Sequence, residues 1–229
     1  MKQDKLYRVL FIGNSYTYYN ELWELFTAVA QSGGYTVQAH YSVRGGAYLE
    51  QSLDAADPLS RQLQALLDTN RYDVVFLQEQ STCPAVQPAR FEAAATALHR
   101  LIVQNGARCV FYQTWGRQTG SPDLALLGMT NREMTERLRE SYEAVGQKLQ
   151  AAVSPVGTAF FEVHTKYPAI ALYDADTTHP ALAGSYLAAL CHYATVFGED
   201  PRTVSFAAGL DAEQAAVLRQ AAYDACFAR

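Results

Sequence analysis

The chain has 229 residues, of which 49% are hydrophobic, so it is long enough to form one domain around a sizeable buried core. Its formal net charge is −5, and its 18 Lys and Arg residues are scattered along the sequence, which argues against a nucleic-acid partner and against an anionic membrane surface. No internal repeat or long linker divides the chain, and we expect a single domain over residues 1–229 without membrane insertion.

The cysteines and the N-terminus indicate a reducing compartment. The four cysteines lie far apart and form no CxxC pair, so we expect free thiols and no disulfide or zinc framework: Cys83, Cys109, Cys191 and Cys226. Residues 1–5 precede only a strand-length apolar run, which lacks the length of a signal-peptide core and its cleavage site. A cytoplasmic location is therefore expected, provided that no leader has been removed.

The first predicted strand leads to a candidate nucleophile. A short apolar run follows Arg8 and ends in the polar sequence Gly13-Asn14-Ser15-Tyr16-Thr17. Such a run is typical of a buried strand, and helical spacing of apolar residues over 21–30 predicts a helix after it. Ser15 then lies in a strand-to-helix connection, where open α/β sheets bind their ligands. It is a candidate nucleophile, and a turn or helix-capping serine is the alternative.

The second strand is expected over residues 35–42, where apolar and polar residues alternate, and it ends at Val43-Arg44-Gly45-Gly46. The glycine pair would let backbone N–H groups approach a ligand closely, although an ordinary loop explains it as well. A helix is expected over residues 58–67.

The third and fourth strands, over residues 72–77 and 108–113, also end in polar residues. The third is followed by Gln78-Glu79-Gln80-Ser81, and Trp115 follows the fourth. Helices are expected over residues 88–104 and 131–152, with a rim loop over 116–128. Residues 153–156, interrupted by Pro155, predict a fifth strand at an edge of the sheet.

The last part of the chain contains a candidate acid and base, Asp176 and His179, followed by Pro180, which suits the first turn of a helix. The inward stripe of that helix is predicted to be Leu182, Tyr186, Ala189, Tyr193 and Phe197. A final helix is expected over residues 211–227.

The alternation of strands and helices predicts a three-layer α/β/α sandwich, flavodoxin-like, with a central parallel sheet of about five strands. All polar strand ends then meet at one edge. There His179 would accept the proton of Ser15, while Asp176 would fix the tautomer of the imidazole, with Asp174 as a competing acid. The backbone N–H groups of Ser15 and Gly46 and the carboxamide of Gln80 would supply an oxyanion hole.

These blocks resemble the SGNH, or GDSL-like, hydrolase superfamily, named for a serine, a glycine, an asparagine and a histidine in four blocks. Gly13-Asn14-Ser15 matches the first block in a Gly-Asn-Ser form, Gly45-Gly46 resembles the second, and Asp176-Thr177-Thr178-His179 matches the Asp-x-x-His of the last. The third block departs from the usual Gly-x-Asn-Asp and is similar to a Gln-Gly-Glu variant of some carbohydrate esterases, with Gln80 near the place of the asparagine.

The resemblance implies a serine esterase that hydrolyses a small acyl ester, such as an acetyl ester of a carbohydrate, through an acyl-enzyme. An acyltransferase or a lysophospholipase would use the same residues, and a flavodoxin-like ligand-binding module is the alternative of another class. Gln78 and Trp115 are candidates to line the substrate pocket, although Trp115 could equally pack on its loop. No metal-ligand spacing or nucleotide motif is present, so no cofactor is expected; the oligomeric state stays open.

Overall fold

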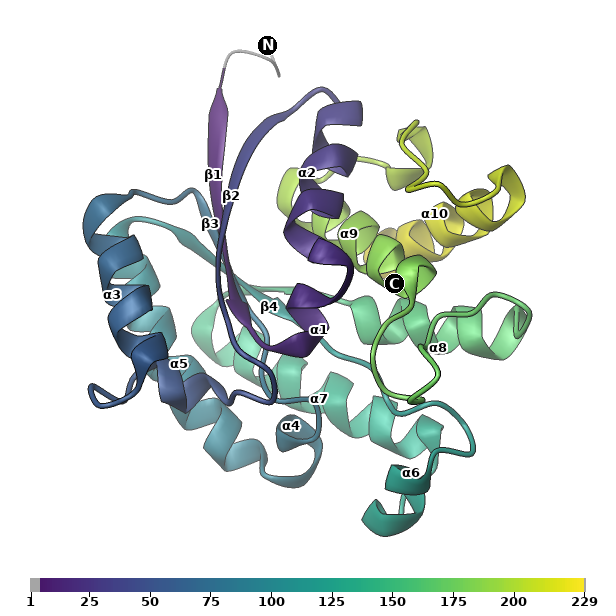
Figure 1. Cartoon of the computed structure of the whole chain (residues 1–229), viewed down its shortest axis with the longest axis horizontal. Helices are drawn as coiled ribbons and strands as arrows, with labels where there is room; N and C mark the ends of the chain where they lie inside the picture. The colour runs from purple at the N-terminus through teal and green to yellow at the C-terminus, as the bar shows by residue number, and fades with distance from the viewer. Residues whose placement is uncertain (1–4, 229) are drawn as a thin grey trace.

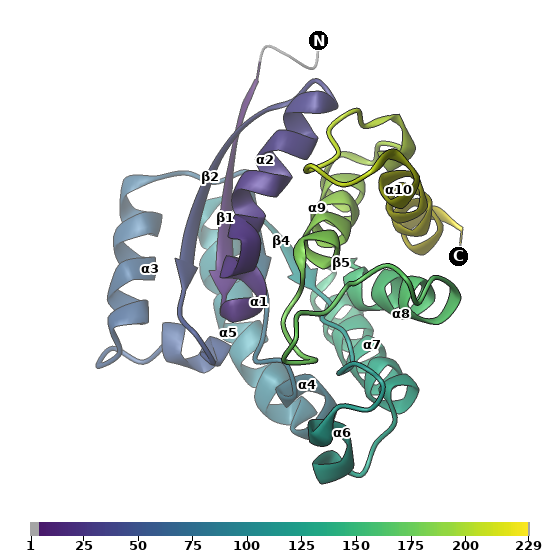
Figure 2. The ribbon, with the colours of Figure 1, turned by 45° about the vertical axis from the view of Figure 1, so that its right-hand side comes forward.

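The computed structural model describes residues 5–228 and is organised around a sheet of five parallel strands in the order β2-β1-β3-β4-β5 (Figure 1). The strands are β1 (Leu6–Gly13), β2 (Thr36–Val43), β3 (Val74–Leu77), β4 (Arg108–Tyr112) and β5 (Ala152–Ser154). Helices cover both faces of the sheet (Figure 2). The predicted three-layer α/β/α sandwich with a parallel sheet is therefore confirmed, and β5 is an edge strand as expected.

Strand β1 is apolar throughout its second half because both of its faces are buried. Val9 and Phe11 pack into one layer, and Leu10 and Ile12 into the other. In the register of the sheet, Gly13 of β1 lies beside Val43 of β2, and Ile12 lies beside Leu77 of β3. The loops that follow these three strands consequently leave the sheet next to one another.

The two helical layers divide the long helices between them (Figure 2). One face is covered by α2 (Leu22–Ser32), α8 (Val156–Lys166) and α9 (Leu182–Phe197), with α10 (Ala212–Phe227) packed against α8 and α9. The other face is covered by α3 (Pro58–Thr69), α5 (Pro88–Asn105) and α7 (Asn131–Leu149). Short helices lie in the connections: α1 (Ser15–Tyr18), α4 (Cys83–Val86), α6 (Pro122–Leu127) and the 3₁₀ turns η2 (Tyr19–Glu21), η3 (Leu49–Ser52) and η4 (Pro201–Thr203).

Three predicted elements differ from the structure. The fifth strand ends at Ser154, because Pro155 is the N-cap of helix α8, and no helix was predicted there. Leu182 is 39% exposed and does not belong to the inward stripe of α9, since it is the first residue of that helix; Tyr186, Ala189 and Tyr193 are buried as expected. The rim segment over 116–128 is not all loop, because it contains α6.

The cysteines are free thiols, as predicted: Cys83, Cys109 and Cys191 are buried, and Cys226 is partly buried. Among the helices of residues 5–228, none combines the length and the apolar character that a membrane span needs.

A neutral histidine lies in the middle of the core. The side chain of His192 is fully buried between the rings of Phe76 and Tyr112, at centroid distances of 4.3 and 4.4 Å, and its Nδ1 lies 2.8 Å from Ser154 Oγ. Its Nε2 has no hydrogen-bond partner among the described residues. Burial lowers the pKa of His192 from 6.5 to about 3, so the imidazole stays uncharged in the folded protein at neutral pH.

This burial predicts a loss of stability in acid. Between pH 6.5 and pH 3 the unfolded chain binds a proton at His192 that the folded chain does not, so stability falls as the pH falls through this range. The variant His192→Gln has no such titration. Urea titrations at pH 8 and pH 5 give the difference in free energy of unfolding between this variant and the wild type. On going from pH 8 to pH 5, this difference should shift by about 2 kcal/mol in favour of the variant. A pH-independent difference between the two proteins would contradict the prediction.

Candidate active site

Ser15 lies at the carboxyl edge of the sheet, as the first residue of α1 directly after β1. Asn14 shapes this connection: its Oδ1 accepts a hydrogen bond from Tyr16 N–H at 3.2 Å, and its Nδ2 donates to the carbonyl of Ala47 at 3.0 Å. The second contact joins the loop of Ser15 to the loop that contains Gly45 and Gly46. As the first residue of a helix, Ser15 has a backbone N–H that the helix itself leaves unbonded.

The structure brings together Ser15, His179 and Asp176. Ser15 Oγ lies 2.8 Å from His179 Nε2, and the opposite ring nitrogen, Nδ1, is hydrogen-bonded to Asp176 Oδ2. The other carboxylate oxygen of Asp176 accepts the N–H groups of Thr178 and His179 at 2.9 and 2.8 Å. Asp174 instead accepts a hydrogen bond from Ala175 N–H at 2.7 Å. The imidazole contact is therefore made by Asp176.

The environment of Asp176 keeps its carboxyl group ionised. Partial burial by itself raises the pKa of Asp176, but hydrogen bonds from the side chain and N–H of His179 and from Thr178 N–H outweigh it and lower this pKa below its usual value. A negative charge thus lies next to Nδ1 of His179 and favours the tautomer with its proton on Nδ1, which leaves Nε2 free to accept the hydrogen of Ser15.

The loop of His179 has a strained backbone. Thr177, a β-branched residue, has φ = +64°, a conformation that costs on the order of 1–3 kcal/mol. Contacts with the segment after β4 hold it: Gln118 N–H donates to the carbonyl of Thr177 at 3.0 Å, and Thr177 Oγ1 donates to Ser121 Oγ at 3.0 Å.

Trp115 packs against the segments that carry Ser15 and His179. Its ring is fully buried and lies parallel to Tyr16 and Phe160, with centroid distances of 4.4 and 4.0 Å and interplanar angles of 3°. Its indole N–H donates to the carbonyl of Thr178, the residue before His179, at 3.2 Å. The expectation that Trp115 lines a substrate pocket is wrong, because the ring is enclosed by its neighbours.

Gln78 is also buried, with 1% of its surface exposed, and it does not line a pocket either. Its Oε1 accepts Asn14 N–H at 2.9 Å and Thr17 Oγ1–H at 3.0 Å, while its Nε2 donates to the carbonyl of Glu79. A Cβ on Gly13 would lie 2.6 Å from Gln78 Oε1, which explains the glycine at this position. Gln78 therefore fixes the loop of Ser15.

The hydrogen bonds of the Gln80 side chain show how its carboxamide is oriented. Its Oε1 accepts the N–H groups of Thr82 and Cys83 at 2.9 and 3.0 Å, as well as Thr82 Oγ1–H at 2.9 Å. Because backbone N–H groups can only donate, the end that faces them must be the carbonyl, and the NH₂ end points away from α4. Gly46, in the neighbouring loop, has φ = +67°.

Two buried ionisable residues at this edge were not predicted to take part in the site. Glu79 is 1% exposed, and its Oε1 accepts Leu49 N–H at 3.1 Å and Gln80 N–H at 2.6 Å. Arg117 is 6% exposed, donates to Ser81 Oγ at 2.9 Å and to Tyr16 Oη, and pairs with Asp123 at 3.1 Å. The polar run at the end of a buried strand pointed towards Glu79, whereas nothing in the sequence distinguishes Arg117.

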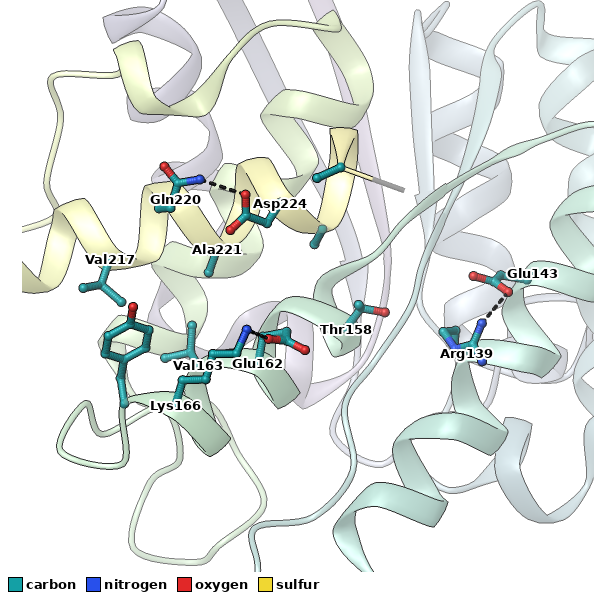
Figure 3. Close-up of a pocket in the computed structure, with 13 residues that line it drawn as sticks. Arg139, Glu143, Thr158, Glu162, Val163, Lys166, Val217, Gln220, Ala221 and Asp224 are labelled. Atoms are coloured by element: carbon teal, nitrogen blue, oxygen red, sulfur yellow. Dashed lines mark hydrogen bonds and ion pairs between the residues drawn. The ribbon is translucent and has the colours of Figure 1, made fainter.

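A separate hollow of about 610 Å³ lies between α7, α8 and α10 and contains none of the residues discussed above (Figure 3). Its charged side chains pair with each other: Arg139 with Glu143, and Lys166 with Glu162, while Gln220 donates to Asp224. These contacts leave it without a converging set of polar groups.

A serine, a histidine and an aspartate in a hydrogen-bonded row, at the carboxyl edge of a parallel sheet, define the serine hydrolase type of site. A protein from Slackia heliotrinireducens described as an SGNH hydrolase is 30% identical to the chain, with a TM-score of 0.74 over 83% of this chain and 99% of that one. The chain belongs to the SGNH hydrolases.

Two further structures share the fold at lower identity. A DUF4886 family protein from Bacteroides uniformis is 17% identical, with a TM-score of 0.81 over 96% of this chain and 95% of that one. An acetylxylan esterase from Geobacillus stearothermophilus is 17% identical, with a TM-score of 0.63 over 87% and 98%. No family model matches the sequence, and no curated protein does.

The burial of Glu79 generates a prediction of opposite sign to that for His192. Burial raises the pKa of Glu79 from 4.5 to about 7, despite the opposing hydrogen bonds from Gln80 and Leu49. The unfolded chain releases this proton at lower pH than the folded chain, so stability is lost as the pH rises from 4.5 to 7. Glu79→Gln keeps the accepting oxygen and does not titrate. In urea titrations, the difference in free energy of unfolding between Glu79→Gln and the wild type should shift by about 2–3 kcal/mol in favour of the variant on going from pH 5 to pH 8. The same difference at both pH values would refute this.

Proposed function

We propose that the protein is a serine esterase that hydrolyses the ester of a small acyl group, such as acetyl, through a covalent acyl-enzyme. The observation that supports this most directly is the 2.8 Å contact between Ser15 Oγ and His179 Nε2, with Asp176 on the opposite ring nitrogen. A serine hydroxyl is a weak nucleophile unless a base accepts its proton, and this arrangement provides the base.

In the proposed mechanism, Ser15 Oγ attacks the ester carbonyl while its proton moves to Nε2 of His179. The charge of Asp176 stabilises the imidazolium that forms. When the tetrahedral intermediate collapses, the C–O bond to the alcohol breaks and the imidazolium protonates the leaving alcohol. A water molecule then attacks the acyl-enzyme with His179 again as the base, which releases the acid and restores Ser15.

The negative charge of the intermediate requires donors, and we propose three: the N–H groups of Ser15 and Gly46 and the NH₂ of Gln80. The orientation of Gln80 supports its part, since its carbonyl end is held by Thr82 and Cys83. For Gly46, the absence of a side chain at φ = +67° allows close approach of a substrate to the backbone.

A carbohydrate acyl ester is the favoured substrate class. It is supported by the resemblance of the third block to carbohydrate esterases and by the shared fold with the acetylxylan esterase. An acyltransferase or a lysophospholipase would use the same three residues, and the accepted alcohol and acyl length distinguish these activities. Hydrolysis rates on p-nitrophenyl esters of increasing chain length, beside acetylated sugars and a lysophospholipid, test the proposal directly.

We expect Ser15 to be the residue that reacts. A fluorophosphonate probe should label the wild type once, at Ser15, because such reagents trap a base-activated hydroxyl. Ser15→Ala should lose labelling and hydrolysis of p-nitrophenyl acetate while its melting temperature stays close to that of the wild type. Peptide mass spectrometry locates the adduct; a label at another residue of an active preparation would disprove the assignment.

The donor role of Gln80 can be tested with a variant that preserves its structural contacts. Gln80→Glu keeps an oxygen to accept from Thr82 and Cys83 but has no NH₂ to donate and adds a negative charge. We expect kcat for p-nitrophenyl acetate to fall about a hundredfold or more, with little change in KM and in melting temperature.

Gln78→Ala is the matched control for Gln80→Glu. It removes the hydrogen bonds to Asn14 and Thr17, so it should lower the melting temperature and alter KM and kcat together. If kcat alone fell in Gln78→Ala while Gln80→Glu kept a normal kcat, the proposal for Gln80 would be wrong and the donor would be Gln78.

A further inference from the structure

The imidazole of His179 is covered on one face by the ring of Tyr19. The two ring centroids are 4.2 Å apart and the planes are inclined by only 7°. A second tyrosine, Tyr16, contacts the imidazole edge-on at 5.8 Å and 73°. The hydrogen bonds to Ser15 and Asp176 both act through the two ring nitrogens and leave the ring free to tip about the line that joins them. A flat contact on the face opposes this tipping.

The backbone after Tyr19 adopts an unfavourable conformation that keeps this ring in place. Asn20 and Glu21 have φ values of +53° and +49°, so two consecutive residues that are not glycine lie in the left-handed region. Such conformations persist only where the surrounding contacts enforce them, and they concentrate at functional sites.

The contacts that enforce this turn lead back to the segment of His179. The side-chain amide of Asn20 donates to the carbonyl of Pro180, the residue after His179, at 3.0 Å, and to Ser185 Oγ at 2.9 Å. Ser185 Oγ in turn donates to the carbonyl of Tyr19 at 3.4 Å. Tyr19 and His179 are thus connected twice, by their stacked rings and by their backbones.

We infer that Tyr19 is a positioning residue that holds His179 in the orientation in which Nε2 faces Ser15. The inference rests on the proposed role of His179 as the base. When the imidazole accepts the proton of Ser15 it becomes a cation, and the face of an aromatic ring attracts a cation. The contact therefore strengthens as the reaction proceeds, and its loss affects kcat more than KM.

The test compares Tyr19→Leu, which removes the aromatic ring, with Tyr19→Phe, which keeps it. Two rates are measured: hydrolysis of p-nitrophenyl acetate, resolved into kcat and KM, and inactivation by a fluorophosphonate. In Tyr19→Leu we expect both kcat and the inactivation rate to fall about ten- to a hundredfold with KM nearly unchanged. Tyr19→Phe should retain both rates within about twofold.

Tyr41→Leu is the matched control. Tyr41 is 45% exposed and stacks on Trp23 at a centroid distance of 4.0 Å, so its replacement also removes a tyrosine ring from a stacked pair, but not from His179. It should leave both rates unchanged. Melting temperatures of all variants show whether the fold is retained.

Three outcomes would overturn the inference: unchanged rates in Tyr19→Leu, equal losses in Tyr19→Leu and Tyr19→Phe, or a raised KM with normal kcat. Equal losses would mean that the hydroxyl group of Tyr19, and not its ring, is the part that matters. A raised KM would mean that Tyr19 contributes to substrate binding. Failure of the proposed esterase activity is distinguishable, because a wild type that hydrolyses no ester but is labelled at Ser15 still permits comparison of inactivation rates.

Discussion

The parallel stack of Tyr16, Trp115 and Phe160 is the contact on which the geometry of the candidate site depends. Each ring comes from a different part of the chain: α1, the segment after β4, and α8. Through its indole N–H, Trp115 also holds the carbonyl of Thr178. Aromatic pairs of this kind contribute about 0.5–1.5 kcal/mol each beyond the burial of their surface. The segments of Ser15 and His179 are therefore placed against one rigid cluster, and their separation does not depend on the loops alone.

The polar residues at the strand ends perform two different tasks, and their unused hydrogen-bonding capacity distinguishes them. Asn14, Gln78 and Glu79 direct their side chains to backbone groups of neighbouring loops. Buried N–H and C=O groups that leave a sheet need such partners, because an unpaired group costs about as much as a lost hydrogen bond. Gln80 differs, since only the carbonyl end of its carboxamide is engaged by neighbouring N–H groups, which is the basis for its proposed role as a donor. Polarity at a strand end is thus a weak sign of function until the partners of each side chain are known.

Much of the fold and the main candidate residues could be predicted from the sequence because they depend on local rules. Apolar runs of strand length and the helices between them gave the parallel sheet, and the shared edge of parallel strands brought Ser15 and His179 into one region. Burial of Trp115 and Gln78 could not be predicted, since it depends on Tyr16, Phe160 and Asn14, which reach them only in the folded chain. The same reason explains why Arg117 was missed. Helix α8 was missed because Pro155 was interpreted as the break in a strand, whereas it is the N-cap residue directly before a helix.

Backbone strain is concentrated around the histidine. Of the five residues other than glycine with positive φ in residues 5–228, three lie in segments that contact or contain His179: Asn20, Glu21 and Thr177. A positive φ at such a residue costs on the order of 1–3 kcal/mol, and in an isolated chain all three residues could adopt more favourable backbone conformations. Two of the three are held by hydrogen bonds to other segments, Asn20 to Pro180 and Ser185, and Thr177 to Gln118 and Ser121. The imidazole is therefore oriented by two segments whose backbone conformations are unfavourable by themselves and are maintained by the rest of the folded protein. A site assembled in this way keeps its geometry only while the surrounding contacts are intact, so substitutions at several residues that never touch a substrate can alter its chemistry.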